Sequence, residues 1–408
     1  MIAARSAACA AAALLALVAG PLSAQEKKPG DEAFREDPYT GNQPEALAAA
    51  GYLSFHPFRF AEGADTAAME QVLGDGVEML WVETAHFKIG SSLPEYLITD
   101  PEERERVRAE LERLKLRLPK VKPKERKLDP WLRLHLFAQR CEETWAEFDR
   151  IFGLAGVEFP AGPGAKVGGV YRGEGPYWGM GDKFTVLLFE KESSYGRIKQ
   201  KYLQGVGGEA SARYLFPKSD SMLFAAHVQG SNMDGDGVLH CALVYNLIHN
   251  FVDGTCHYSF PVPPWLSTGL AHHFARAISP KQNYFTEDKA YTPDEKDVWN
   301  WPPRVHARVK NEVWPTAAKL FAIADAAELK YTDHMMAWSR VDYLVRERQP
   351  AMGAFLLGLK AQIAEGRAPT AAEIAAQHDR AFTAAFGMDA AGFDAAWTAW
   401  VLKTYPKK

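Results

Sequence analysis

Two apolar segments in the middle of the chain constrain its fold most. Residues 237–252, GVLHCALVYNLIHNFV, carry apolar side chains at helical spacing and are long enough for a buried helix. We expect Asp253-Gly254 to end this helix. Pro263-Pro264-Trp265 then begins a second helix with the sequence WLSTGLAHHFARAI. The spacing therefore predicts two consecutive buried helices.

The segments before this pair predict a mixture of strands and helices. Asp100-Pro101 and Asp129-Pro130 each combine an N-cap residue with proline at the first helical position, which favours helices at 100–118 and 129–152. Period-two and apolar runs predict strands at 77–89, 184–190, 214–216 and 222–227, the last two joined as a hairpin, with a helix at 194–203 between them and 184–190. The basic segment 119–128, PKVKPKERKL, is interpreted as a solvated connector, with an anionic partner or a membrane as the alternative.

The order of these elements predicts an α+β fold in two parts. After a leader and a short N-terminal segment (25–77), a mixed α/β lobe spans residues 78–235. A mainly helical lobe spans residues 236–408. In this lobe we expect a polar loop at 280–310, followed by helices at 315–328, 333–348, 351–365, 370–386 and 390–404.

The N-terminus has the composition of a secretory signal peptide. Arg5 precedes the apolar run 10–18, and Gly20-Pro21 leads to a small-residue cleavage site after Ala24. Residues 1–24 therefore predict export to a periplasm or the extracellular space, with an uncleaved anchor as the alternative. No later segment has the length and apolarity expected of a transmembrane helix.

Charge and cysteine content narrow the function classes. The formal net charge of −4 gives no reason to expect nucleic acid as a partner. An oxidising compartment permits one disulfide among Cys141, Cys241 and Cys256. Cys241 with Cys256 is the natural pair, and three buried thiols are the alternative.

The second apolar helix carries a family resemblance. Its segment Pro263–Ala271, PPWLSTGLA, resembles the P-x-W-L-x-E-G-L-A segment of the peptidase MA-like gluzincins. The order of the elements from about residue 78 to the C-terminus is similar to that family too. The resemblance implies a gluzincin-like zincin fold. In such an enzyme two imidazoles and a glutamate hold zinc, and a second glutamate polarises the bound water.

Most of the corresponding positions here hold other residues. The HExxH slot reads Tyr245-Asn246-Leu247-Ile248-His249, so Tyr245 replaces the first imidazole and Asn246 replaces the base. Thr268 stands where the resemblance places the third ligand. A single imidazole does not hold zinc tightly, and an amide is not a general base. We therefore expect no catalytic residues, no cofactor and no metal.

These substitutions predict an exported pseudo-peptidase that binds a peptide or protein in its cleft. One alternative is a metal-dependent hydrolase with zinc on a rearranged set, His249, Asp253 and His272 or His273, which His240 and His257 could join. Another is a structural envelope protein with a vestigial cleft. Catalysis by Ser267 or Thr268 is disfavoured because no G-x-S-x-G motif surrounds them.

Overall fold

The computed structural model describes residues 36–407, except for 62, 75, 160–165, 168–169, 172, 257–261, 284–298 and 360–369. The chain divides into two compact units, Met1–Asp37 and Pro38–Lys408, and the description that follows concerns the second. The predicted signal peptide and His257 lie outside the described residues. Both predicted lobes, 78–235 and 236–408, fall within the second unit.

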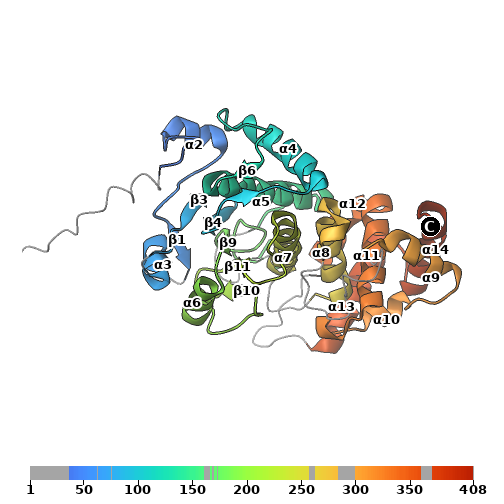
Figure 1. Ribbon diagram of the computed structural model, residues 1–408. Coiled ribbons are helices and arrows are strands. Elements are labelled where there is room, and N and C mark those ends of the chain that lie inside the picture. The colour runs from blue at the N-terminus through green and yellow to red at the C-terminus, as the bar shows by residue number, and fades with distance from the viewer. Residues whose placement is uncertain are drawn as a thin grey trace, which may run out of the picture. The chain divides into compact units, whose positions relative to one another are not determined.

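The second unit is α+β, with a sheet in its N-terminal part and helices in its C-terminal part (Figure 1). In the described part of the chain the largest sheet has five strands in the order β10-β11-β9-β4-β3. Strands β4, β9 and β11 run parallel to one another, while the outer strands β10 and β3 are antiparallel to their neighbours. The strands are β3 (Leu80–Glu83), β4 (Phe87–Ser91), β9 (Phe184–Phe189), β10 (Ser211–Phe216) and β11 (Ser221–His227).

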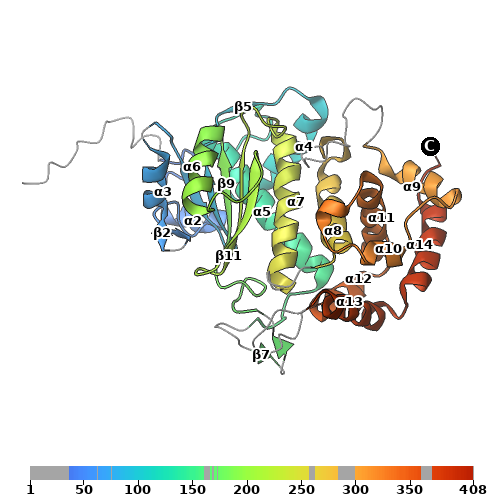
Figure 2. The same cartoon turned by 90° about the horizontal axis from the view of Figure 1, so that it is seen from below.

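Helices cover both faces of this sheet, which explains why its central strands are apolar throughout. Every residue of β4, β9 and β11 is buried. On one face, α3 (Thr66–Leu73) and α6 (Glu192–Tyr202) enclose an apolar core that includes Leu187 and Leu223. On the other face, Phe184 contacts Phe251 of α7 (Asp236–Cys256). Figure 2 shows α6 and α7 on opposite sides of the strands.

The predicted helix starts at the two Asp-Pro pairs are confirmed. Helix α4 spans Pro101–Lys115, and α5 spans Pro130–Phe152. Asp100 accepts a hydrogen bond from the Glu103 amide at 2.7 Å, and Asp129 accepts one from the Leu132 amide at 3.0 Å. The basic segment that joins these helices continues into a short strand, β6 (Lys127–Leu128), which pairs with β5 (Tyr96–Leu97).

The two central helices are α7 (Asp236–Cys256) and α8 (Pro264–Ile278). The prediction that Asp253-Gly254 ends the first helix is wrong, because both residues lie inside α7. Asp253 forms an ion pair with Arg213 of β10. A Cβ atom on Gly254 would lie 3.0 Å from the Met180 side chain, so this glycine serves close packing rather than helix termination.

Of the two alternatives for the cysteines, the structure has the three buried thiols and not the Cys241–Cys256 disulfide. Cys141, Cys241 and Cys256 all carry buried thiols. Because Cys241 and Cys256 lie on the same helix, a rise of 1.5 Å per residue places them about 22 Å apart, beyond the reach of a disulfide. Each thiol instead faces a backbone carbonyl, that of Ala275 for Cys241 and that of Leu356 for Cys256.

The C-terminal part is helical, as predicted, but its boundaries differ. The expected loop at 280–310 contains helix α9, which begins at Trp301 with prolines in its first turn. In place of the helix expected at 315–328, the chain forms the short helix α10 (Ala317–Phe321) and a 3₁₀ turn at Ala326–Glu328. The helices are α9 (Trp301–Lys310), α10 (Ala317–Phe321), α11 (Tyr331–Glu347), α12 (Gln349–Gly358), α13 (Ala371–Phe386) and α14 (Ala390–Thr404), with 3₁₀ turns η1 (Pro280–Gln282) and η2 (Ala326–Glu328).

Helix α11 packs closely against α8 at a glycine. A Cβ atom on Gly269 would lie 2.7 Å from Val341 and 2.8 Å from the Ala337 carbonyl oxygen, both of α11. The glycine of the WLSTGLA segment therefore lets two helices approach each other. The remaining short elements are α2 (Pro44–Ala50), β1 (Arg59–Ala61), β2 (Ala64–Asp65), β7 (Lys166–Val167) and β8 (Val170–Tyr171).

A buried ion network fixes the start of α7. The carboxylate of Asp236 is fully buried and lies 2.8 Å from Arg140 and 3.6 Å from Arg133, both of α5. Arg140 also pairs with Glu110 of α4 at 2.7 Å. The Arg140 and Arg133 charges hold the pKa of Asp236 below its ordinary value although burial opposes this. The network thus joins α4 and α5 to the N-terminal end of α7.

Removing the shared cation should destabilise the protein strongly. In Arg140→Ala, two buried carboxylates lose their common partner, and we expect the free energy of unfolding to fall by about 3–5 kcal/mol. The matched control is Arg150→Ala, which removes an exposed pair with Glu147 on the same helix and should cost under about 1 kcal/mol. Urea titration measures both. Equal losses for the two variants would contradict a structural role for the network.

Candidate functional site

Tyr245, His249 and Thr268, the residues at the positions where the resemblance would place zinc ligands, lie where α7 packs on α8. The Tyr245 ring contacts the rings of His249 and His272, with centroid distances of 4.9 and 5.1 Å. The Thr268 side chain lowers the pKa of this phenol as a hydrogen-bonding neighbour, so it lies close to the Tyr245 hydroxyl. His249, Thr268 and His272 are buried, and Tyr245 is partly exposed. Three residues singled out from the sequence thus lie around the phenol of a fourth, Tyr245.

Two further side chains join this cluster from distant parts of the chain. His334 of α11 lies 3.0 Å from His272, measured between Nδ1 and Nε2. The ring of Trp301, on α9, lies 5.0 Å from the His272 ring. Sequence reasoning missed both residues, because neither belongs to a motif and His334 lies 62 residues beyond His272. We call Tyr245, His249, Thr268, His272, His334 and Trp301 the phenol cluster.

Burial keeps Tyr245, His249 and His272 of the phenol cluster neutral. It holds the pKa of His249 well below its ordinary value, and the charges of Arg213 and His334 act in the same direction. Burial likewise lowers the pKa of His272 well below its ordinary value. Burial raises the pKa of Tyr245 to about 12, although Arg213 and Thr268 oppose the shift. The cluster therefore presents hydrogen-bonding groups and no anionic oxygen.

Asn246, at the position where the resemblance would place a general base, is directed to its own helix. Its amide donates to the carbonyl oxygen of Ala242, one turn earlier, at 2.8 Å. An amide has no basic lone pair to accept a proton from water, and here its donor side is occupied. Ser267 likewise lies near a carbonyl of its own helix, that of Pro264, at 3.5 Å. Neither side chain is arranged for catalysis of the kinds considered from the sequence.

The rearranged metal set is distributed among different partners. Asp253 pairs with Arg213, His273 lies 3.4 Å from the carboxylate of Asp342, and His272 contacts His334. Among the residues that the structure describes, no three His, Cys, Asp or Glu side chains are grouped to hold a metal ion. The zinc that the family resemblance implies does not fit the donors at its own positions either, which are a neutral phenol, one imidazole and a hydroxyl.

The sheet edge lies next to the phenol cluster. Arg213 of β10 donates to Asn250 of α7 at 2.8 Å and pairs with Asp253. The His227 amide donates to the Ala210 carbonyl, so these two opposite residues form a hydrogen-bonded pair of the β10–β11 ladder. Hydrogen-bonded and non-hydrogen-bonded pairs alternate along an antiparallel ladder. The N–H and C=O groups of residues 211, 213 and 215 therefore point away from β11. In the described part of the chain no strand pairs with this side of β10. An open sheet edge therefore runs beside α7.

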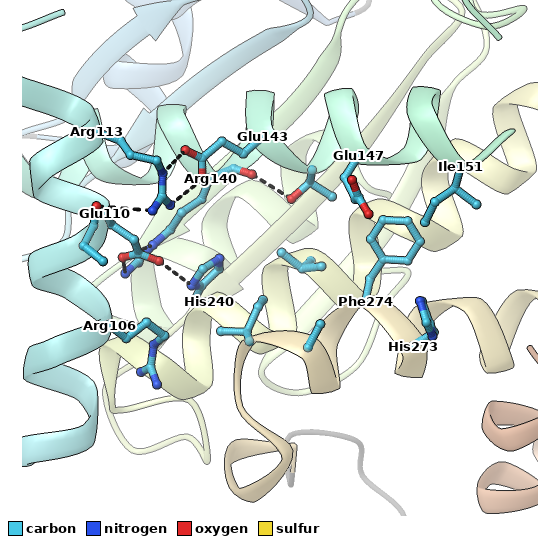
Figure 3. Close-up of a pocket in the computed structure, with 15 residues that line it drawn as sticks. Arg106, Glu110, Arg113, Arg140, Glu143, Glu147, Ile151, His240, His273 and Phe274 are labelled. Atoms are coloured by element: carbon cyan, nitrogen blue, oxygen red, sulfur yellow. Dashed lines mark hydrogen bonds and ion pairs between the residues drawn. The ribbon is translucent and has the colours of Figure 1, made fainter. Parts of the chain in front are cut away.

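A cleft of about 370 Å³ lies on a different face of α7 from the phenol cluster. Figure 3 shows it between α5 and α8, with Glu147 and Phe274 at one end and Arg113, Glu110 and His240 at the other. Its charges are largely paired within the wall: Arg113 binds Glu143 at 2.7 and 2.9 Å, and His240 lies 3.4 Å from Glu110. His240 and His273 line this cleft and do not belong to the phenol cluster.

Comparisons with known proteins found no match for the chain among family models or among curated proteins.

The neutral histidines predict a loss of stability in acid. The unfolded chain binds a proton at His249 below a pH of about 6.5, whereas the buried imidazole does not. The neutral His249 therefore contributes fully to the free energy of unfolding above that pH. Below it, this contribution falls by about 1.4 kcal/mol for each unit by which the pH decreases. Urea titrations at about pH 7.5 and about pH 5.5 should show a shallower pH dependence for His249→Gln than for wild type. An unchanged slope would mean that His249 is charged in the folded protein.

Proposed function

We propose that the protein is an exported, non-hydrolytic peptide-binding protein with a gluzincin-like fold. The observation that carries the proposal is the approach of Tyr245 to Thr268, whose side chain acts on the pKa of the phenol as a hydrogen-bonding neighbour. This approach joins the first and third ligand positions of the resemblance directly, in the space where a peptidase of that family holds its metal. His249 and His272 pack against the same phenol and are neutral.

The chemistry of these groups supports binding rather than hydrolysis. Peptide hydrolysis of the zincin type requires an activated water and a base to accept its proton. Asn246 offers an amide already bonded to Ala242, and Tyr245 is a neutral phenol. Both kinds of group bind ligands by hydrogen bonds without changing their protonation.

The edge of β10 supports a peptide as the ligand. An extended chain adds to an open strand through main-chain hydrogen bonds, while pockets beside the strand select its side chains. The outward backbone groups of residues 211, 213 and 215 supply the main-chain hydrogen bonds, and we expect Tyr245, a partly exposed member of the phenol cluster, to contact a side chain of the peptide. Arg213 adds a cation between them that is shared with Asp253.

Export is proposed from residues 1–24 alone, and the periplasm and the extracellular space both agree with it. In the part of the chain that the structure describes, no helix combines the length and the apolarity needed to cross a membrane.

Restoring the zinc-binding side chains should restore zinc binding. We expect the variant Tyr245→His, Asn246→Glu and Thr268→Glu to bind one zinc ion. Its imidazoles at positions 245 and 249 would lie one helical turn apart and face the new carboxylate on α8. Isothermal titration with zinc measures this, with the wild type as the control. A folded variant that binds no zinc would show that these positions do not correspond to the family's ligands.

Blocking the sheet edge should abolish peptide binding. Leu215→Pro removes an amide that faces away from β11, so the sheet should survive while an added strand loses a hydrogen bond and meets the proline ring. On an array of immobilised peptides we expect binding at least about tenfold weaker than for wild type. Leu215→Ala, which keeps the amide, is the control.

The same array separates the proposal from a vestigial cleft. If wild type captures no peptide on the array, the cleft is not a peptide-binding site. If Leu215→Ala and Leu215→Pro weaken binding equally, the peptide does not add to β10.

A further inference from the structure

Positive charge is concentrated in one segment of a chain that is acidic overall. Residues 113–127, RLKLRLPKVKPKERK, contain eight lysines and arginines and one acid, Glu125, whereas the whole chain has a formal charge of −4. The segment covers the last turn of α4 and the connection to β6. Its sequence alternates cations with leucine, valine and proline.

The segment is held in place by buried apolar anchors. Leu118, Val121 and Leu128 are almost completely buried. Backbone hydrogen bonds join Val121 to Leu118, Glu125 to Lys122 and Ile98 to Arg126. The cations between the anchors are exposed, so the fold directs them to solvent. The exposed cations agree with the solvated connector expected from the sequence, while the buried anchors fix where the cations lie.

Some cations of the segment are paired within the protein, Arg113 with Glu143 and Lys127 with Glu95, both at 2.7 Å. Lys122, Lys124 and Arg126 form no ion pair with any residue that the structure describes. By contrast, Arg106 and Arg108, on the preceding part of α4, pair with Glu103 and Glu112 of the same helix. Like charges held close together without counter-charges cost free energy, and an external anionic surface would relieve it.

Two leucines protrude beside these cations. Leu116 is 84% exposed and Leu97 is 60% exposed. Leu97 lies opposite Lys127 in the β5–β6 pair, so their side chains share one face of that ribbon. Leu116 follows the last residue of α4, at the start of the cationic connection. Neither leucine lines a pocket described in the structure.

We propose that residues 113–127, together with Leu97, form a docking surface for an anionic lipid bilayer. Cations near such a surface each contribute to binding through the negative potential of the headgroups, and protruding apolar side chains insert below them. A bilayer accepts protruding leucines without a preformed cavity, whereas a folded acidic protein needs a complementary one. The surface is separate from the phenol cluster and does not depend on the proposed function.

Vesicle binding tests the proposal. The full-length chain is sedimented with vesicles of phosphatidylcholine and phosphatidylglycerol, and binding to vesicles of phosphatidylcholine alone is subtracted to remove any contribution of the apolar N-terminus. We expect binding that weakens as salt is raised. The variant Lys122→Gln, Lys124→Gln and Arg126→Gln should bind on the order of 100-fold more weakly. Leu116→Ser should bind about tenfold more weakly.

Matched variants complete the experiment. Lys191→Gln, Lys201→Gln and Lys218→Gln neutralise three exposed lysines elsewhere, and Leu402→Ser replaces an exposed leucine of α14. Both should bind like wild type. Three results would overturn the proposal: no binding to the anionic vesicles at low salt, an equal loss in the control variants, or an unaffected Leu116→Ser. The last would show that the segment responds to negative charge alone and that Leu116 does not insert into the bilayer.

Discussion

The ion pair between Arg140 and Asp236 is the interaction on which the arrangement of this protein depends. It is fully buried, and it ties the first turn of α7 to the middle of α5. A buried charge without a partner is costly, so α7 cannot rotate or slide along its axis without breaking this pair. The rotational position of α7 in turn decides which side chains face α8. The contacts of Tyr245 and His249 therefore depend on a pair of charges about two to four turns away.

The packing of α8 follows from a second constraint, at Gly269. Because this residue has no side chain, α11 approaches α8 closely enough for His334 to reach His272. The phenol cluster is thus assembled from helices that are held by an ion network at one end and by a close helix contact at the other. A rigid, desolvated arrangement of this kind explains why His249 and His272 stay neutral and why the Tyr245 phenol stays protonated.

The elements that could be predicted from the sequence are those with a strong local cause. Asp100-Pro101 and Asp129-Pro130 begin helices because their carboxylates accept amide hydrogens whatever the rest of the fold does. Local signals failed where tertiary contacts decide. Asp253-Gly254 resembles a helix end, but Arg213 and the packing at Met180 keep both residues in α7. Pro302 and Pro303 resemble a loop, although both fit the first turn of α9.

The candidate site was predictable only in part, for the same reason. Tyr245 and His249 are one turn apart on one helix, and the resemblance brought in Thr268. The parts played by His334, Trp301 and Arg213 depend on long-range packing that no spacing reveals. Likewise, the cationic segment was recognisable as a charge run, but the exposure of Leu116 and the buried anchors of the segment emerge only in three dimensions.

We propose above all that a direct contact between Tyr245 and Thr268 occupies the place of a metal ion. A crystal structure of the wild-type protein grown with zinc, with anomalous scattering recorded at the zinc absorption edge, tests this most directly. We expect a hydrogen bond between the two hydroxyl groups and no anomalous peak beside His249. An anomalous peak bonded to His249, with Tyr245 turned away from Thr268, would contradict the proposal.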